Sequence, residues 1–257
     1  MAEIPFERLL IGLETVARGT AVDPPTHWLL MVGTVTPMQE RYLPDESRGS
    51  LIAHYRSKTV RRWCELEASG PLDSYALPVL AHMAIDGSVT PSTPGGGTNS
   101  RLWAFVPTVT SDDIDSATVF WGDPNVREFR APYVMLDELV ITSDASTTDG
   151  ATMEITGQGH FPTDDAPDSV PSSVESPLFA PGAMQLWIDT GTDGIGTTEI
   201  TDNRLIGVTI TIPTGVTRKL TAAGAGATLN FTKTGRGKRA ATLQITLQVP
   251  DDDELTG

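Results

Sequence analysis

The stretch Arg41–Arg62, RYLPDESRGSLIAHYRSKTVRR, separates two runs with the composition of β-strands, His27–Thr36 and Val60–Ala68. Hairpin loops usually take about 2–5 residues, so this connection is far too long for a simple turn. It is crowded with charged and aromatic residues, which is unusual for a slack linker. We therefore predict a loop over residues 37–59 that reaches a neighbouring subunit, and we expect a protein that assembles rather than one that catalyses.

The composition of the whole chain favours strands and turns. Thr, Val, Ile, Gly and Pro are plentiful, and 39% of the 257 residues are hydrophobic, which is enough for a packed core. Apolar and β-branched runs predict strands at 27–36, 60–68, 101–109, 116–122, 131–143, 151–159, 183–189, 204–212, 227–233 and 240–249. These predict a mainly β fold, a β-sandwich or barrel of about ten strands with one packed α-helix.

The one convincing helix is Asp73–Ile85, DSYALPVLAHMAI, whose apolar residues recur at helical spacing. Proline is tolerated only near the first turn of a helix, so Pro78 predicts a start at Ala76 or Leu77. Along Val60–Ala68 the residues alternate between two strand faces. One face holds Arg62, Cys64, Leu66 and Ala68, and the other holds Arg61, Trp63, Glu65 and Glu67.

The domain organisation that we expect is simple. Residues 1–25 contain several helix breakers and are predicted to be an N-terminal arm. Residues 26–249 form a single domain, in which the Pro-, Asp- and Ser-rich segment 161–181 is a variable surface loop. Residues 250–257 are an acidic C-terminal tail.

Charge is unevenly distributed along a chain whose net charge is −15. Residues 110–170 hold 13 acids against 2 bases, whereas residues 218–239 hold 6 bases and no acid, and residues 40–62 hold 6 bases against 3 acids. Segregated charge suits contacts in which a basic patch on one copy meets an acidic patch on the next. Solvated loops are the plainer explanation of each patch, and both explanations stay open here.

Candidate catalytic and ligand-binding motifs are few. The chain has one cysteine, Cys64, which cannot form an internal disulfide and is predicted to be a buried small hydrophobe. No histidine pair has zinc-ligand spacing, and neither a nucleophile elbow nor a phosphate loop is present. We expect no enzyme activity, no cofactor and no metal. The six bases of residues 218–239 lack interleaved aromatics, so they indicate nucleic-acid recognition only weakly.

The segment after the apolar run near residue 185 has two alternative explanations. Asp189-Thr190-Gly191 has the composition of an aspartic-protease loop, but no second such triplet supplies the partner carboxylate. The span Asp189–Glu199 has some features of a calcium loop, yet Ile200 stands where an EF-hand needs its final acid. A Gly-rich turn is the plainer interpretation.

Four segments carry a family resemblance. They are IGLETVARGTAVDPPTHWLLMVGTVTP, RGSLIAHYRSKTVRRWCELEASG, DSYALPVLAHMAIDG and RLWAFVPTVTSDDIDSATVFWGD. In this order they resemble the N-terminal Gly-x-Glu-Thr-x-x-Gly-Thr segment, the inter-ring loop with its following strand, the short helix and the next hairpin of tail tube (major tail) proteins of long-tailed bacteriophages. The resemblance covers roughly residues 8–160 and is only architectural beyond them.

The resemblance implies a structural virion protein, made in the cytoplasm of a host bacterium, without membrane insertion. Such subunits form hexameric rings that stack by self-assembly into a hollow viral tail tube. DNA and the tape-measure protein pass through the channel during DNA ejection, and tail tip and tail terminator proteins cap the tube. A channel for DNA must not bind it, so an acidic lumen is expected.

Two residue sets follow from these expectations. For contact between subunits we predict Arg41, Tyr42, Arg48, Tyr55, Arg56 and Lys58, because aromatic and arginine side chains often dominate interfaces. For the lumen we predict Asp112, Asp113 and Asp115. An intrachain flap is the alternative for the loop. A tail terminator, a decoration protein or a carbohydrate-binding β-sandwich module are the alternatives for the whole chain.

Overall fold

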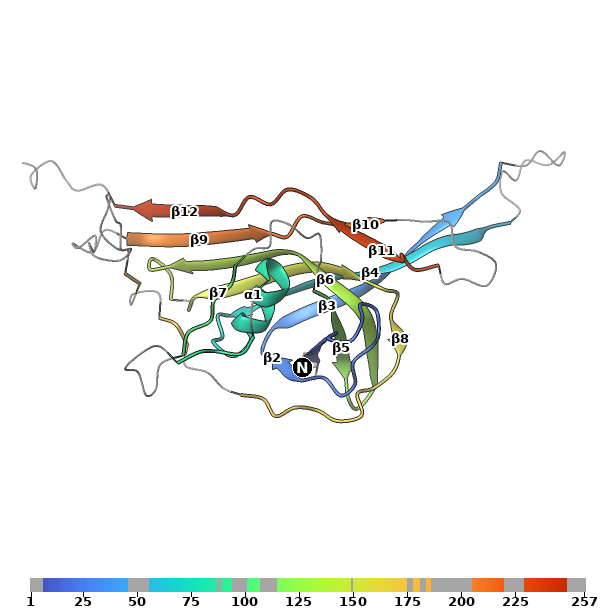
Figure 1. Ribbon diagram of the computed structural model, residues 1–257, viewed down its shortest axis with the longest axis horizontal. Helices are drawn as coiled ribbons and strands as arrows, with labels where there is room; N and C mark the ends of the chain where they lie inside the picture. The colour runs from blue at the N-terminus through green and yellow to red at the C-terminus, as the bar shows by residue number, and fades with distance from the viewer. Residues whose placement is uncertain are drawn as a thin grey trace, which may run out of the picture.

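The computed structural model describes residues 7–45, 56–86, 89–93, 101–106, 115–148, 150–174, 178–180, 184–185, 205–219 and 229–248 (Figure 1). Its elements are β1 Arg8–Leu13, β2 His27–Leu29, β3 Val32–Tyr42, β4 Lys58–Pro71, α1 Leu77–Ile85, β5 Ala117–Asp123, β6 Arg127–Asp144, β7 Thr152–Gly159, β8 Thr163–Asp164, β9 Leu205–Pro213, β10 Val216–Lys219, β11 Lys233–Arg236 and β12 Thr242–Leu247. The predicted mainly β fold with one helix is confirmed for these residues. Among them, no helix is long and apolar enough to cross a membrane.

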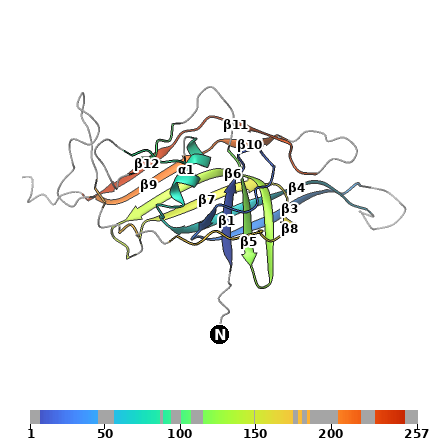
Figure 2. The ribbon, with the colours of Figure 1, turned by 60° about the horizontal axis from the view of Figure 1, so that its bottom comes forward.

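Ten strands form one antiparallel sheet in the order β2-β1-β5-β6-β7-β4-β3, to which β8, β9 and β12 add as branches. The long strand β6 joins two halves: its first part pairs with β5 and β8, and its second part pairs with β7 and β9. Figures 1 and 2 show β1 and β5 crossing the long strands steeply, so the sheet bends over itself. Register shifts near Leu136 and Ala117 are the bulges at which such a bend is made.

The hydrophobic core lies between the two halves of the sheet and the helix. Its largest buried side chains include Leu66 of β4, Leu80 and Met83 of α1, Leu139 of β6 and Met153 of β7. The helix begins at Leu77 as predicted, and the backbone N–H of Tyr75 donates to Asp73 Oδ1 in the turn before it (2.8 Å). The core therefore covers one face of β4 and β7 and leaves their other face to solvent.

The expected N-terminal arm is wrong for residues 8–13. These residues form β1, an interior strand between β2 and β5, and Leu9, Leu10 and Ile11 are at most 2% exposed. The glycine and proline residues that suggested an arm lie at the end of this strand and beyond it. A short apolar run with no alternation is typical of a strand buried on both faces.

Three further expectations change in extent. Residues 101–106 make only an isolated bridge between Ser92 and Leu102, so the strand predicted at 101–109 is not formed by its described part. Strands β3 and β4 extend into the predicted loop, because β3 continues to Tyr42 and β4 begins at Lys58. The variable loop 161–181 contains the two-residue strand β8. The acidic tail 250–257 and Asp189–Glu199 lie outside the described residues.

Burial makes Cys64 an inert thiol. The side chain is fully buried, and desolvation raises its pKa from 9.0 to about 12. We expect no reaction with Ellman's reagent at pH 8 in the folded protein and one thiol per chain after denaturation. Because the folded pKa is the higher one, this thiol should leave stability unchanged below about pH 9 and reduce it as the pH rises toward 12. Rapid labelling of the folded protein would contradict this burial.

Candidate assembly and channel surfaces

Strands β3 and β4 leave the body of the sheet as a two-stranded ribbon (Figure 1). Strand β4 pairs with β7 only from Cys64 onward, but it pairs with β3 as far as Lys58. The residues beyond Cys64 toward the ribbon end therefore have a partner strand on one side only. A bulge between Glu40 and Arg41 adds twist to this segment.

The ribbon end gathers four of the six predicted contact residues. Arg41, Tyr42, Arg56 and Lys58 are all exposed, and Tyr42 keeps 60% of its surface in solvent. Arg48 and Tyr55 lie outside the described residues. The described ends of the ribbon extend away from the body (Figure 1). Their contact with another subunit stays a prediction.

The base of the ribbon is held to the β10–β11 hairpin. The guanidinium of Arg218 lies 4.5 Å from the ring centre of Trp63, and the backbone N–H of Arg62 donates to the carbonyl of Leu229 (3.0 Å). The hairpin itself covers a second small apolar cluster. Its members are Tyr133, Met135, Val216 and Phe231. These contacts fix where the ribbon emerges.

A groove of about 370 Å³ lies between the ribbon base and the hairpin. It is lined by Glu40, Arg61, Trp63, Gln158, Val216, Thr217 and Arg218. The stacked guanidinium of Arg218 occupies a face of the Trp63 ring. This arrangement lacks the bare aromatic platform expected of a carbohydrate-binding module.

The solvent face of the long strands carries four glutamates. They are Glu65 and Glu67 of β4, Glu138 of β6 and Glu154 of β7. Three are exposed and Glu138 is partly buried, and none of the four pairs with a described Lys or Arg. We call these residues, with the threonines and serine between them, the acidic face.

The register spaces these charges apart. Glu65 lies between Thr36 and Gln158. Glu67 lies between Thr34 and Thr156. Like charges directly opposite each other destabilise a sheet, whereas here every glutamate faces neutral neighbours across the strands. The four glutamates therefore place negative charge on this face without direct repulsive pairs.

Alternation creates the acidic face, but only the register reveals it. On β4 the buried Cys64 and Leu66 alternate with the exposed Glu65 and Glu67, as the sequence predicted. Sequence reasoning assigned those glutamates to one strand face and gave them no role. The feature of the sequence that could have revealed this surface is the Glu-x-Glu pattern of Glu65 and Glu67, which alternates with buried residues. What was missing was the knowledge that β6 and β7 contribute acids to the same surface.

Asp115, predicted to face a channel, lies elsewhere. Its carboxylate is 3.5 Å from Nε2 of His82 on α1, on the side of the sheet opposite the acidic face. Burial raises the pKa of Asp115, and the nearby His82 opposes that rise. Asp115 therefore does not belong to the acidic face, because it lies beside α1 on the core side, and its assignment to a lumen stays a prediction. Asp112 and Asp113 lie outside the described residues.

His82, Asp86 and Asp115 bring one ligand atom each within 4.8 Å of one another. Such a donor set could suit a metal ion, but Arg18 and Arg236 lie close enough to Asp115 to lower its pKa. Those positive charges oppose a cation. The cluster therefore brings opposite charges close together where the end of α1 approaches Arg236 of β11.

A buried carboxylate, Glu14, organises the segment after β1. Its oxygens accept hydrogen bonds from the backbone N–H of Gly19 (2.6 Å) and of Tyr133 (2.8 Å), and from the hydroxyls of Ser116 (2.6 Å) and Thr118 (2.9 Å). Gly19 has a φ of 76° and Tyr133, within β6, a φ of 57°, so both residues adopt the left-handed region. Sequence analysis used this Glu only as part of a resemblance and missed its structural role.

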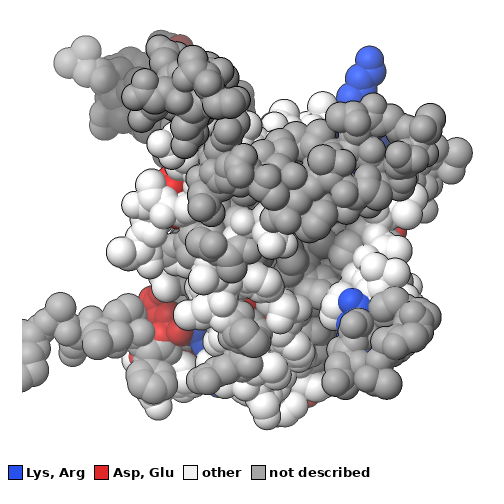
Figure 3. Space-filling view, turned by 90° about the vertical axis from the view of Figure 1, so that its left-hand side faces the viewer, with Lys and Arg blue, Asp and Glu red and all other residues white. Residues whose placement is uncertain are grey.

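The end of the molecule opposite the ribbon differs in character (Figure 3). Its described surface is largely uncharged, with a small acidic group at one margin and scattered basic side chains. A basic ribbon end and this end would face each other if copies were stacked in one direction.

No protein-family model and no curated protein matches this chain.

Proposed function

We propose that this protein is the structural subunit of a bacteriophage tail tube, forming stacked hexameric rings around a channel for DNA and tape-measure protein. The observation that carries the proposal is the acidic face. It is a broad, solvent-exposed sheet surface with four glutamates and no Lys or Arg opposite them across the strands. No catalytic constellation competes with it among the described residues.

The physics of a DNA conduit favours such a surface. Duplex DNA carries one negative charge per about 1.7 Å of its axis, so basic side chains in a channel would hold it. The Thr, Ser and Glu side chains of the acidic face offer like-charge repulsion and no basic group to which phosphate could bind.

The projecting ribbon supports the stacking part of the proposal. It carries exposed basic and aromatic side chains away from the fold that anchors it, as a contact between rings requires. Its base is held by packing against the β10–β11 hairpin. Folding of the subunit therefore does not depend on the ribbon end.

Negative-stain electron microscopy of the purified protein at low and high concentration tests the proposal. Hollow tubes, formed alone or after addition of assembled tail tips, are the expected result. Single rings or flat lattices at all concentrations would favour a tail terminator or decoration protein. Persistent monomers in the presence of tail tips would contradict every assembly role and favour a carbohydrate-binding module.

Reversing the ribbon charge is expected to block stacking. In the double variant Arg41→Glu, Lys58→Glu two of the exposed ribbon bases become acidic, and they would repel the small acidic group at the opposite end of the next copy (Figure 3). We expect single rings in place of tubes, with an unchanged unfolding midpoint. The control Arg41→Lys, Lys58→Arg keeps both charges and should still form tubes. Normal tubes from the reversed variant would remove the ribbon charge from the stacking contact.

A further inference from the structure

The array of six long strands, in the order β3-β4-β7-β6-β9-β12, has two free edges. Within the described part of the chain, neither β12 nor β3 pairs with a strand on its outer side. The β12 sequence, Thr242–Leu247, contains no charge, and Leu243 and Leu247 are 60% and 43% exposed. Natural proteins usually protect a free strand edge with charges or cover it with another segment. Because β12 carries no charge, we expect another segment to cover its edge.

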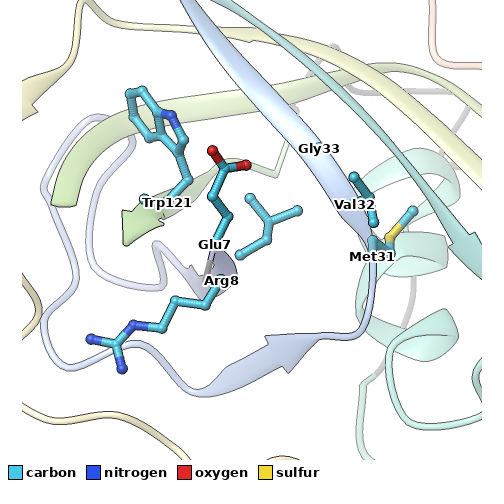
Figure 4. A pocket seen from close by; sticks show the side chains of 8 residues that line it. Glu7, Arg8, Met31, Val32, Gly33 and Trp121 are labelled. Carbon is cyan, nitrogen blue, oxygen red and sulfur yellow. The ribbon is translucent and has the colours of Figure 1, made fainter. Parts of the chain in front are cut away.

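A hollow of about 240 Å³ adjoins the other edge, at the start of β3 (Figure 4). It is lined by Glu7, Arg8, Leu9, Met31, Val32, Gly33, Trp121 and Gly122. Its wall is mainly apolar, and Val32 at its rim is 82% exposed. The hollow therefore offers an apolar binding surface beside the free edge of β3.

The strand register shows that these two features lie at the same level. One row crosses the array through Thr242, Thr211, Val140, Glu154, Ser69 and Val32. The next residue, Leu243, pairs with Ile210 on the core side of the sheet. This adjacent row runs from Leu243 through Ile210, Ile141 and Met153 to Gly70. Met31, which precedes Val32 in the chain, lies beside Gly70 at the end of this row and lines the hollow. Leu243 therefore lies in the same row as Met31 and on the same side of the sheet as the hollow, the side that faces the core.

Strand direction makes the two edges compatible. Each of the five steps from β12 to β3 is antiparallel, so these two strands run in opposite directions. A second copy that continues the array by rotation would place its β3 antiparallel to β12. When a contact joins two different surfaces of the same chain, successive copies are related by a rotation. They form a closed ring if repeating that rotation returns to the first copy.

We propose that β12 of one copy pairs antiparallel with β3 of the next, with Leu243 seated in the hollow beside Met31 and Val32. This inference rests on the proposed function and names the lateral contact that makes the ring. Strand β12 belongs to the C-terminal third of the chain. The charges agree, since continuing this register toward the N-terminus of β12 brings exposed Lys238 level with the β3–β4 row that holds Thr36 and Glu65.

Disulfide trapping tests the pairing. In an antiparallel pair, opposed Cα atoms are about 4.5–5.5 Å apart, which is within the range that a disulfide spans. We expect the double variant Val32→Cys, Thr242→Cys to give, on oxidation of assembled protein, a ladder of covalent oligomers on a non-reducing gel. Each single variant should give none, and native Cys64 is too buried to interfere.

A matched control moves one cysteine inward by one strand. In Val32→Cys, Thr211→Cys the second thiol sits on β9 directly opposite Thr242, so the two Cα atoms would be about 10 Å apart and should not link. Strand tilt in a closed barrel can shift the register, so Gln244→Cys and Thr246→Cys are paired with Val32→Cys as well. A ladder from any of these three β12 positions supports the pairing.

The remaining outcomes separate this inference from the proposed function. Tubes that form normally while none of the three pairs links would overturn the β12–β3 contact and leave the tail-tube proposal intact. A ladder without tubes would support the lateral contact and contradict stacking. Absence of both ladders and assembly, also after tail tips are added, would overturn both proposals.

Discussion

Replacing Glu14 by alanine is expected to lower the free energy of unfolding by about 4 kcal/mol. The substitution removes the acceptor for four donors, two of which, the hydroxyls of Ser116 and Thr118, belong to residues that are at most 2% exposed. A buried donor without an acceptor costs about 1–3 kcal/mol, and the four losses are not fully additive. Urea denaturation followed by tryptophan fluorescence measures the change.

The Glu14 effect should be specific to its position. Glu7, in the same segment, is exposed and has no side-chain partner among the described residues, so Glu7→Ala should change stability by less than about 0.5 kcal/mol. Glu14→Gln keeps the size and one acceptor oxygen, and we expect an intermediate loss of about 2 kcal/mol. If all three variants unfolded at the wild-type midpoint, the four hydrogen bonds would not be holding the segment after β1 in place.

Charge reversal on the acidic face should turn a surface that excludes DNA into one that binds it. In the variant Glu65→Lys, Glu67→Lys, Glu154→Lys three acids become three bases on exposed positions. Each new phosphate contact adds about −0.9 to the slope of log affinity against log salt, so three contacts give a slope near −3. Fluorescence anisotropy of a labelled duplex, measured over a salt series, reports both affinity and slope.

Two controls separate a local from a global effect of charge. The neutral variant Glu65→Gln, Glu67→Gln, Glu154→Gln removes repulsion without adding contacts, and it should not bind DNA tightly. A second variant reverses Glu7, Asp45 and Asp168, which are exposed but lie outside the acidic face, and it has the same net charge as the first. Equal binding by the two reversed variants would show that net charge, not this face, governs DNA exclusion.

Local sequence patterns predicted several elements correctly, because the relevant interactions span only a few residues. Alternation in β4 places Cys64 and Leu66 inside and Glu65 and Glu67 outside, as found. Pro78 limits where α1 can begin, and the helix does begin at Leu77. The long, charged connection between β3 and β4 indicated a loop that reaches a neighbouring subunit. Its described ends extend from the body as a ribbon, and the contact with a neighbour stays a prediction.

Elements that depend on distant partners were missed. Strand β1 was taken for an arm, since its apolar run is short and only pairing with β2 and β5 makes it an interior strand. Asp115 was assigned by its place in an acidic stretch, yet the fold puts it beside α1. Glu14 bonds to Ser116, 102 residues along the chain, so nothing near it in the sequence marks it as buried.

The sequence by itself determined the class of fold, the single helix, and which residues of each strand share a face, because side-chain alternation is a local property of the backbone. Only the tertiary structure decided which strands are neighbours and in what register. That long-range pairing collects glutamates from β4, β6 and β7 into one acidic face, and it leaves β12 and β3 as free edges of opposite direction. Surfaces of this kind arise from contacts between distant segments, so no local pattern encodes them.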